Sequence, residues 1–132
     1  MVLLDTSGLL CCFDADDFRH GDAVRHYGTA PLRLTHNYVL AEFVALTQSR
    51  RLPRGTSLDF AATLMADLEI EVVWVSIALH DEAMTLLKSQ LDKSYSLGDA
   101  VRFVLMRQRN ILDALTTDRH FEQAGFRRLL AT

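Results

Sequence analysis

The chain has 132 residues, of which 49% are hydrophobic and 23% charged, and its formal net charge is −3. These values predict one folded domain over residues 1–132, and no apolar run reaches the ~20 residues of a membrane span. The net negative charge argues against a general polyanion-binding protein, and the first residues do not resemble a signal peptide. The only cysteines, Cys11 and Cys12, are adjacent, so we expect neither a disulfide nor a zinc site, and a cytoplasmic location.

Short strands and helices alternate in the first half of the chain. In chain order we expect a strand at 2–5, helices at 7–13 and in the second part of 14–28, a strand at 32–35, and helices at 37–50 and 57–68. The strand at 32–35 is predicted because leucines alternate there with polar residues. The second helix is expected to turn Ala23, Val24 and Tyr27 inward, and the helix at 37–50 has an apolar stripe that includes Val39 and Phe43.

The second half continues the same alternation. We expect a strand at 71–76, helices at 77–91 and 96–110, a strand at 113–117 and a fifth strand within "FRRLLA". The segment 71–76 is apolar and β-branched, as in strands that are covered on both faces. Strands separated by helices require crossover connections and hence a parallel sheet. The predicted fold class is therefore α/β, a Rossmann-like three-layer sandwich with a central parallel sheet of four to five strands flanked by helices.

Four acidic residues occupy comparable places in this scheme. Asp5 and Asp118 follow the first and fourth strands, Glu42 lies in the second turn of the helix after the second strand, and Asp99 begins the helix at 96–110. Ligands of parallel α/β sheets bind outside the carboxyl ends of the strands. We therefore expect these four carboxylates to converge at one edge of the sheet.

Three of these acids have a structural alternative. Asp5 could cap the first helix, Asp99 completes an S-x-x-D capping box with Ser96, and Asp118 could cap the turn that follows it. Glu42 is too far into its helix to cap it, and no lysine or arginine lies three or four residues away. A half-buried glutamate needs a partner, because an unpaired buried charge is costly.

Clustered acids without matching bases are typical of sites for hard divalent cations. Mg²⁺ binds carboxylates while it keeps several waters, and two-metal sites share carboxylates between ions roughly 3.5–4 Å apart. Such a site activates water and stabilises the oxyanions formed during attack on a phosphodiester. We therefore interpret Asp5, at the end of an apolar strand, as a metal ligand.

The segments "VLLDTSGLL", "THNYVLAEF", "SLGDAVRFVLMRQRNI" and "ALTTDRHFEQAGF" resemble the four motif regions of the PIN domain, in order and spacing, over essentially the whole chain. The resemblance implies a PIN-like fold and an endoribonuclease that depends on Mg²⁺ or Mn²⁺. It places the catalytic, metal-binding tetrad on Asp5, Glu42, Asp99 and Asp118. It also implies an RNA substrate, an antitoxin partner if the protein is a VapC-type toxin, and a homodimer.

Several basic residues are candidates for contacts with RNA phosphates. They are the arginines of "RRLPR" (50–54) and Arg102, Arg107, Arg109 and Arg119. Arginines at the end of a helix also complement its dipole, so a structural role for the segment 50–54 is an alternative. We expect His120 to contact the turn that contains Asp118.

Two other kinds of protein could have such a sequence. A PIN-like module could bind RNA or a protein without cleaving RNA; the complete tetrad disfavours this alternative. A phosphatase or phospho-acceptor domain would use the strand-end aspartate as a nucleophile. Phosphatases of that kind need a second aspartate two residues later, where this chain has Ser7. Receiver domains need a late lysine, and this chain has no lysine after Lys93.

Overall fold

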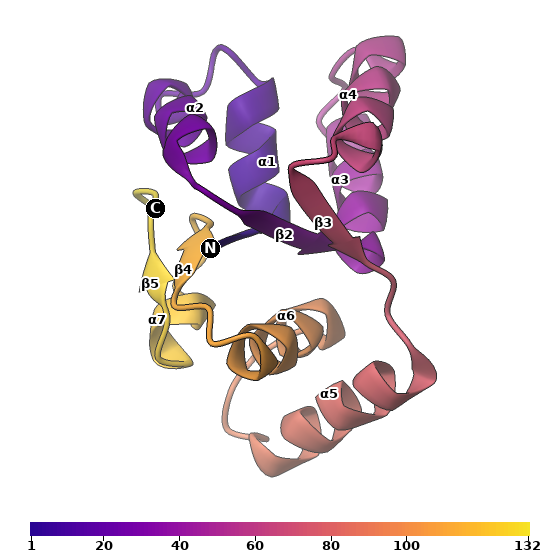
Figure 1. The fold of residues 1–132 in the computed structure, drawn as a ribbon, viewed down its shortest axis with the longest axis vertical. Coiled ribbons are helices and arrows are strands. Elements are labelled where there is room, and N and C mark those ends of the chain that lie inside the picture. The colour runs from indigo at the N-terminus through magenta and orange to yellow at the C-terminus, as the bar shows by residue number, and fades with distance from the viewer.

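The computed structural model describes residues 1–132 and has five strands and seven helices (Figure 1). The strands are β1 (Val2–Leu4), β2 (Arg33–His36), β3 (Ile70–Val73), β4 (Asp113–Leu115) and β5 (Arg127–Arg128). The helices are α1 (Thr6–Phe13), α2 (His20–Thr29), α3 (Asn37–Ser49), α4 (Arg54–Ala66), α5 (Ile77–Ser89), α6 (Leu97–Gln108) and α7 (His120–Gln123). No helix combines the length and the hydropathy needed to cross a lipid bilayer.

The strands form one parallel sheet in the order β3-β2-β1-β4-β5. Leu3 of β1 is in register with Leu34 of β2 on one side and Ala114 of β4 on the other, so the first strand of the chain is the central one. Helices α1 to α4 cover one face of the sheet, and α5 to α7 lie on the other side (Figure 1). The predicted α/β three-layer sandwich with a parallel sheet is confirmed.

The core follows from the alternation of side chains along the central strand. Val2 and Leu4 belong to the hydrophobic cluster on the side of α1 to α4, while Leu3 packs with residues of α6 and α7 such as Phe103 and Phe121. All three strand residues are at most 7% exposed. A strand buried on both faces is apolar throughout, which explains why "VLL" carries no polar residue before Asp5.

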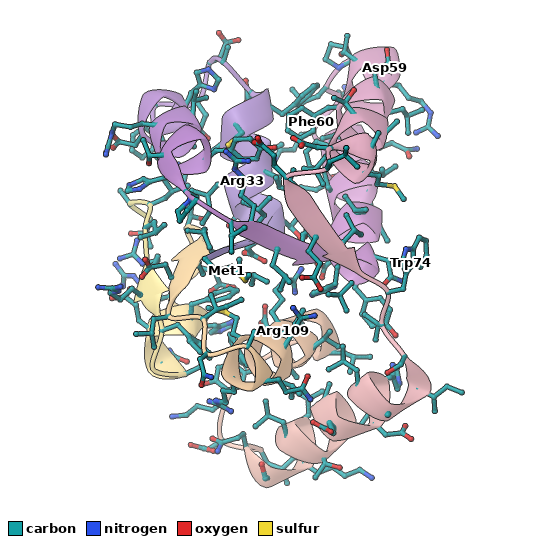
Figure 2. The ribbon with its side chains drawn as sticks, viewed as in Figure 1. Met1, Arg33, Asp59, Phe60, Trp74 and Arg109 are labelled. Atoms are coloured by element: carbon teal, nitrogen blue, oxygen red, sulfur yellow. The ribbon has the colours of Figure 1, made fainter.

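The prediction that the strand at 71–76 is covered on both faces is wrong. β3 ends at Val73 and lies at the edge of the sheet, where Glu71 is exposed and Trp74, directly after the strand, is 66% exposed. Figure 2 shows Trp74 beyond the tip of β3, pointing away from the sheet. Both central strands and edge strands with an exposed apolar end can be apolar in composition. Composition alone therefore did not show that β3 is an edge strand.

Smaller differences concern the helices. α4 begins at Arg54, three residues before the predicted start, because Pro53 is tolerated at a helix N-terminus, where its missing N–H is not needed. α7 was not predicted as a helix.

Ala23 is buried as expected and Tyr27 is partly buried, but Val24 is 47% exposed. The free cysteines agree with the prediction, with Cys11 buried and Cys12 partly buried.

Helix α1 packs closely against the end of β4 at Gly8. A Cβ atom built at Gly8 would clash with the backbone carbonyl of Leu115, which cannot move without shifting β4. The absence of a side chain therefore fixes how near the start of α1 lies to the carboxyl end of the central strands.

We predict that Gly8→Ala destabilises the protein by at least about 2 kcal/mol, because overpacking here displaces backbone rather than a side chain. The matched control is Gly21→Ala in α2, where an added Cβ meets no atom within 4 Å. That variant should keep or slightly raise the stability. Thermal unfolding monitored by circular dichroism measures both, and equal melting temperatures for the two variants would contradict the prediction.

Candidate metal-binding active site

The four predicted carboxylates line one pocket at the carboxyl edge of the sheet. Its volume is about 530 Å³. The lining residues come from the strand ends and from α1, α3 and α6: Asp5, Thr6, Ser7, Glu42, Ala45, Leu46, Ser49, Asp99, Arg102 and Asp118. The structure therefore brings together all four residues that the sequence singled out, although they lie far apart in the chain.

Asp5 sits at the N-cap position of α1, but its side chain does not cap the helix. Its Oδ2 atom instead accepts hydrogen bonds from the hydroxyls of Thr116 (2.7 Å) and Ser7 (3.2 Å). Asp5 is only 5% exposed. The alternative of a capping role for Asp5 is wrong, and two hydroxyls hold one oxygen of its carboxylate.

Asp118 lies in the loop after β4, next to the same hydroxyl network. Its backbone N–H donates to Oγ1 of Thr116 at 3.0 Å, and its Oδ1 accepts the backbone N–H of His120 at 2.9 Å. The His120 ring also approaches it, with Nδ1 3.5 Å from Oδ2. The expected contact between His120 and the turn that contains Asp118 is confirmed, and so is the local capping bond.

Asp99 combines two roles that the sequence left open. It forms the predicted capping box, in which Ser96 Oγ accepts the N–H of Asp99 and Asp99 Oδ2 accepts the N–H of Ser96, both at 3.0 Å. The same carboxylate lies in the pocket, 3.1 Å from Nδ1 of His120. Burial raises its pKa, and the nearby charges of Asp118 and Asp5 add to the increase.

Glu42 has the partner that the sequence could not identify. The hydroxyl of Thr6 donates to its Oε2 at 2.9 Å, and Nη2 of Arg102 contacts the same oxygen. Its side chain is 40% exposed at the mouth of the pocket. Glu42 has no base on its own helix, as the sequence indicated, and the base that pairs with it comes from α6.

Arg102 is the largest correction to the sequence analysis. The side chain is 2% exposed and lies among three of the acids: Nε is 2.7 Å from Oδ1 of Asp5, Nη2 contacts Glu42, and Nη1 is 3.7 Å from Oδ1 of Asp99. The Nε–H bond is not aligned with Asp5, so that contact is an ion pair without a hydrogen bond. Arg102 is therefore not a surface contact for phosphate, and the acids are not free of bases.

The donor set nevertheless fits a divalent cation. Ligand atoms of Asp99, Asp118 and His120 lie within 4.8 Å of one another, and carboxylate oxygens are what Mg²⁺ and Mn²⁺ prefer. Four carboxylates and one guanidinium leave a formal charge of −3 in the pocket when His120 is neutral. Arg102 thus offsets part of the repulsion, and enough negative charge remains to attract a divalent ion.

The other arginine candidates lie outside the pocket. Arg109 pairs with Glu71, and Arg107 donates to the carbonyl of Ala124. Arg119 is exposed, and so are the arginines of 50–54, which follow directly on Ser49 in the pocket wall. Arg119 likewise follows directly on Asp118, so both it and the segment 50–54 adjoin the pocket.

Sequence reasoning missed five residues of the site: Thr6, Ser7, Arg102, Thr116 and His120 as a member of the ligand cluster. A signal existed for two of them. Arg102 is three residues after Asp99, hence on the same helix face, and His120 is two residues after Asp118 in the same turn. The hydroxyls of Ser7 and Thr116 become recognisable only when the ends of β1 and β4 are known to be neighbours.

Comparison with known proteins identifies relatives of this chain. The family model described as "PIN domain" matches residues 2–127. The 23S rRNA-specific endonuclease VapC20 of Mycobacterium tuberculosis (strain CDC 1551 / Oshkosh) is 32% identical over 127 residues, which cover 96% of this chain and 95% of VapC20. VapC20 of strain ATCC 25618 / H37Rv matches equally well.

A solved structure gives the same result. The crystal structure of Mycobacterium tuberculosis VapC20, described as a Sarcin-Ricin loop cleaving toxin, matches with a TM-score of 0.89 and 30% identity, and the match covers 98% of this chain and 99% of that chain. Sequence and fold agree over nearly the full length. The chain therefore belongs to the PIN domain family, among its VapC-type members.

Proposed function

We propose that the protein is an endoribonuclease that depends on Mg²⁺ or Mn²⁺ and hydrolyses RNA phosphodiester bonds at this pocket. The observation that carries the proposal is the convergence of Asp5, Glu42, Asp99 and Asp118 in one pocket at the carboxyl edge of the sheet. VapC20 is a 23S rRNA-specific endonuclease, which supports RNA as the substrate class. The sarcin-ricin loop of 23S rRNA is the first substrate to test.

The residues of the pocket would have different roles. Asp99 and Asp118 would hold the cation, and His120, next to both, would orient them. A bound divalent cation supplies an activated water and stabilises negative charge on the phosphodiester oxygens. Ser7 and Thr116 fix the carboxylate of Asp5 by hydrogen bonds, so that it cannot turn away from the pocket.

The alternative function is a PIN-like module that binds RNA or a protein without cleaving RNA. One observation favours it: Arg102 already neutralises part of the acidic cluster. Cleavage assays separate the two functions, because the binding module would retain RNA without cutting it in the presence of either metal.

We predict that the purified protein cleaves RNA in millimolar Mg²⁺ or Mn²⁺ and that EDTA stops the reaction. Asp118→Asn should lower the cleavage rate at least about 100-fold, because it removes a ligand charge next to the reacting phosphate. The control is Asp113→Asn at the opposite end of the β4 segment, where the carboxylate pairs with Arg127 outside the pocket. If Asp118→Asn cleaves as fast as Asp113→Asn, the activity belongs to a contaminant or to another site.

Asp99→Asn tests the second role of the capping-box residue without a substrate. The raised pKa of Asp99 means that its ionised form destabilises the folded protein above that pKa, and the penalty is relieved as the pH falls through it. Asparagine removes this charge and still offers an oxygen to the N–H of Ser96. In EDTA at neutral pH, the variant should therefore melt at the wild-type temperature or higher.

With metal the order should reverse. Wild type gains stability by mass action, about 2.7 kcal/mol when the free ion reaches 100 times its Kd, and Asp99→Asn should lose most of this gain. Differential scanning calorimetry with and without Mn²⁺ measures both effects. A variant that melts clearly lower in EDTA yet keeps the full gain from metal would show that Asp99 serves the capping box alone.

We further propose that the protein is the toxin of a pair whose other member is a small antitoxin protein, in keeping with its VapC-type relatives. The reading frame next to its gene provides the test. A neighbouring small protein that co-purifies with the chain and suppresses cleavage would support the pair, and an isolated gene would count against it.

We predict that the protein forms a homodimer. Trp74 and Ile77, between the edge strand β3 and α5, are 66% and 84% exposed, and large exposed apolar side chains are common at interfaces. Sedimentation at micromolar concentration should give about twice the 14.9 kDa of one chain. Trp74→Ser should shift the equilibrium toward the monomer, whereas Leu112→Ser, another exposed apolar site, should not; a purely monomeric wild type would contradict the prediction.

A further inference from the structure

Arg102 divides the acidic pocket into two parts with different cations. We infer that its guanidinium is the permanent cation of the Asp5–Glu42 part and that the protein binds a single divalent ion, in the part formed by Asp99 and Asp118. The inference rests on the proposed metal dependence and deepens it, because it assigns the metal to two acids of the tetrad and gives Glu42 a different role.

The contacts of Arg102 account for the first part. Its guanidinium lies against Asp5 and Glu42, and its contact with Asp99 is longer, at 3.7 Å. Nη2 also donates to the hydroxyl of Thr6 at 3.0 Å, which in turn donates to Glu42. An arginine side chain stays protonated in proteins, and this one is 2% exposed. The side chain cannot move to solvent without leaving buried carboxylates unpaired.

The backbone makes room for this arrangement at Gly98. A Cβ atom at that position would lie 2.5 Å from Oε1 of Glu42 and 2.7 Å from Nη1 of Arg102. A side chain at position 98 would thus meet both members of the pair. Glycine at the start of a helix, beside the capping residue, is what allows Glu42 and Arg102 to meet across α3 and α6.

The second part has the ligands of one ion. Asp99, Asp118 and His120 form the one group of three or more potential ligands whose atoms all lie within 4.8 Å of one another, and no group of that size includes Asp5 or Glu42. A two-metal site needs carboxylates that bridge ions roughly 3.5–4 Å apart. In this pocket, Asp5 and Glu42 face the guanidinium of Arg102. A second metal ion bound by these two carboxylates would be repelled by that positive charge.

Binding of Mn²⁺ to the whole protein tests the inference, with free Mn²⁺ followed by electron paramagnetic resonance and heat by titration calorimetry. We expect wild type to bind one ion. Glu42→Gln should change its Kd by no more than about threefold, as for a charge near a site rather than in it, while Asp118→Asn should weaken it at least about tenfold. If Glu42→Gln weakens Mn²⁺ binding as much as Asp118→Asn, or if wild type binds two ions, the inference is wrong.

Replacement of the arginine gives the complementary result. Arg102→Met should bind two ions, because Asp5 and Glu42 then need a cation from solvent, and its melting temperature should rise more with Mn²⁺ than that of wild type. Arg102→Lys keeps the charge and should bind one ion, as should the control Arg109→Met, whose ion pair with Glu71 lies outside the pocket. If folded Arg102→Met binds only one Mn²⁺ ion, the inference is wrong. If that variant does not fold even with Mn²⁺, the Kd of Glu42→Gln for Mn²⁺ is the deciding measurement.

These outcomes are separate from those of the proposed function. A wild-type protein that binds no Mn²⁺ and cuts no RNA refutes the metal-dependent nuclease together with the inference drawn from it. A wild-type protein that cuts RNA with Mn²⁺ but binds two ions, or uses Glu42 as a ligand, refutes the division of the pocket and leaves the nuclease intact.

Discussion

Repulsion among carboxylates at the carboxyl edge of the sheet is the constraint on which the arrangement of the site depends. Parallel topology brings Asp5, Asp99 and Asp118 to one place and buries the first two, where water screens their charges poorly. Arg102 offsets this repulsion from inside the protein, and the hydroxyls around Asp5 complete its hydrogen bonding. Without these contacts the folded state would bear unpaired buried charges, each of which is strongly destabilising.

The strand order turns this local arrangement into a property of the fold. Because β1 lies between β2 and β4, the residue that follows it is near both the start of α3 and the loop after β4. The Asp5 side chain accordingly contacts Ser7, Arg102 and Thr116, which come from α1, α6 and the end of β4. Gly8 keeps α1 close to Leu115, so the acid, the hydroxyls and the loop with Asp118 stay in one rigid unit.

Much of this architecture could be predicted from the sequence, for a physical reason. Alternating strands and helices require parallel crossovers, and acids placed after strands must then meet at one edge. Strand order is not encoded in the periodicity of a strand, so β3 was not recognised as an edge. The role of Arg102 was missed for a similar reason: the sequence places it on the face of α6 that carries Asp99, but its contact with Glu42 depends on how α3 and α6 pack.

The residual charge of the pocket links metal and RNA. With Arg102 in place the four acids still leave a formal charge of −3, and an RNA phosphate cannot approach such a surface without a counter-charge. A divalent cation between Asp99 and Asp118 would reduce that charge where the phosphate must bind. Binding of metal and of RNA should then strengthen each other equally, since coupling between two ligands is reciprocal. Because the protein neutralises only part of the negative charge of the pocket, enough remains to bind a divalent cation, and the bound cation would then attract the anionic substrate.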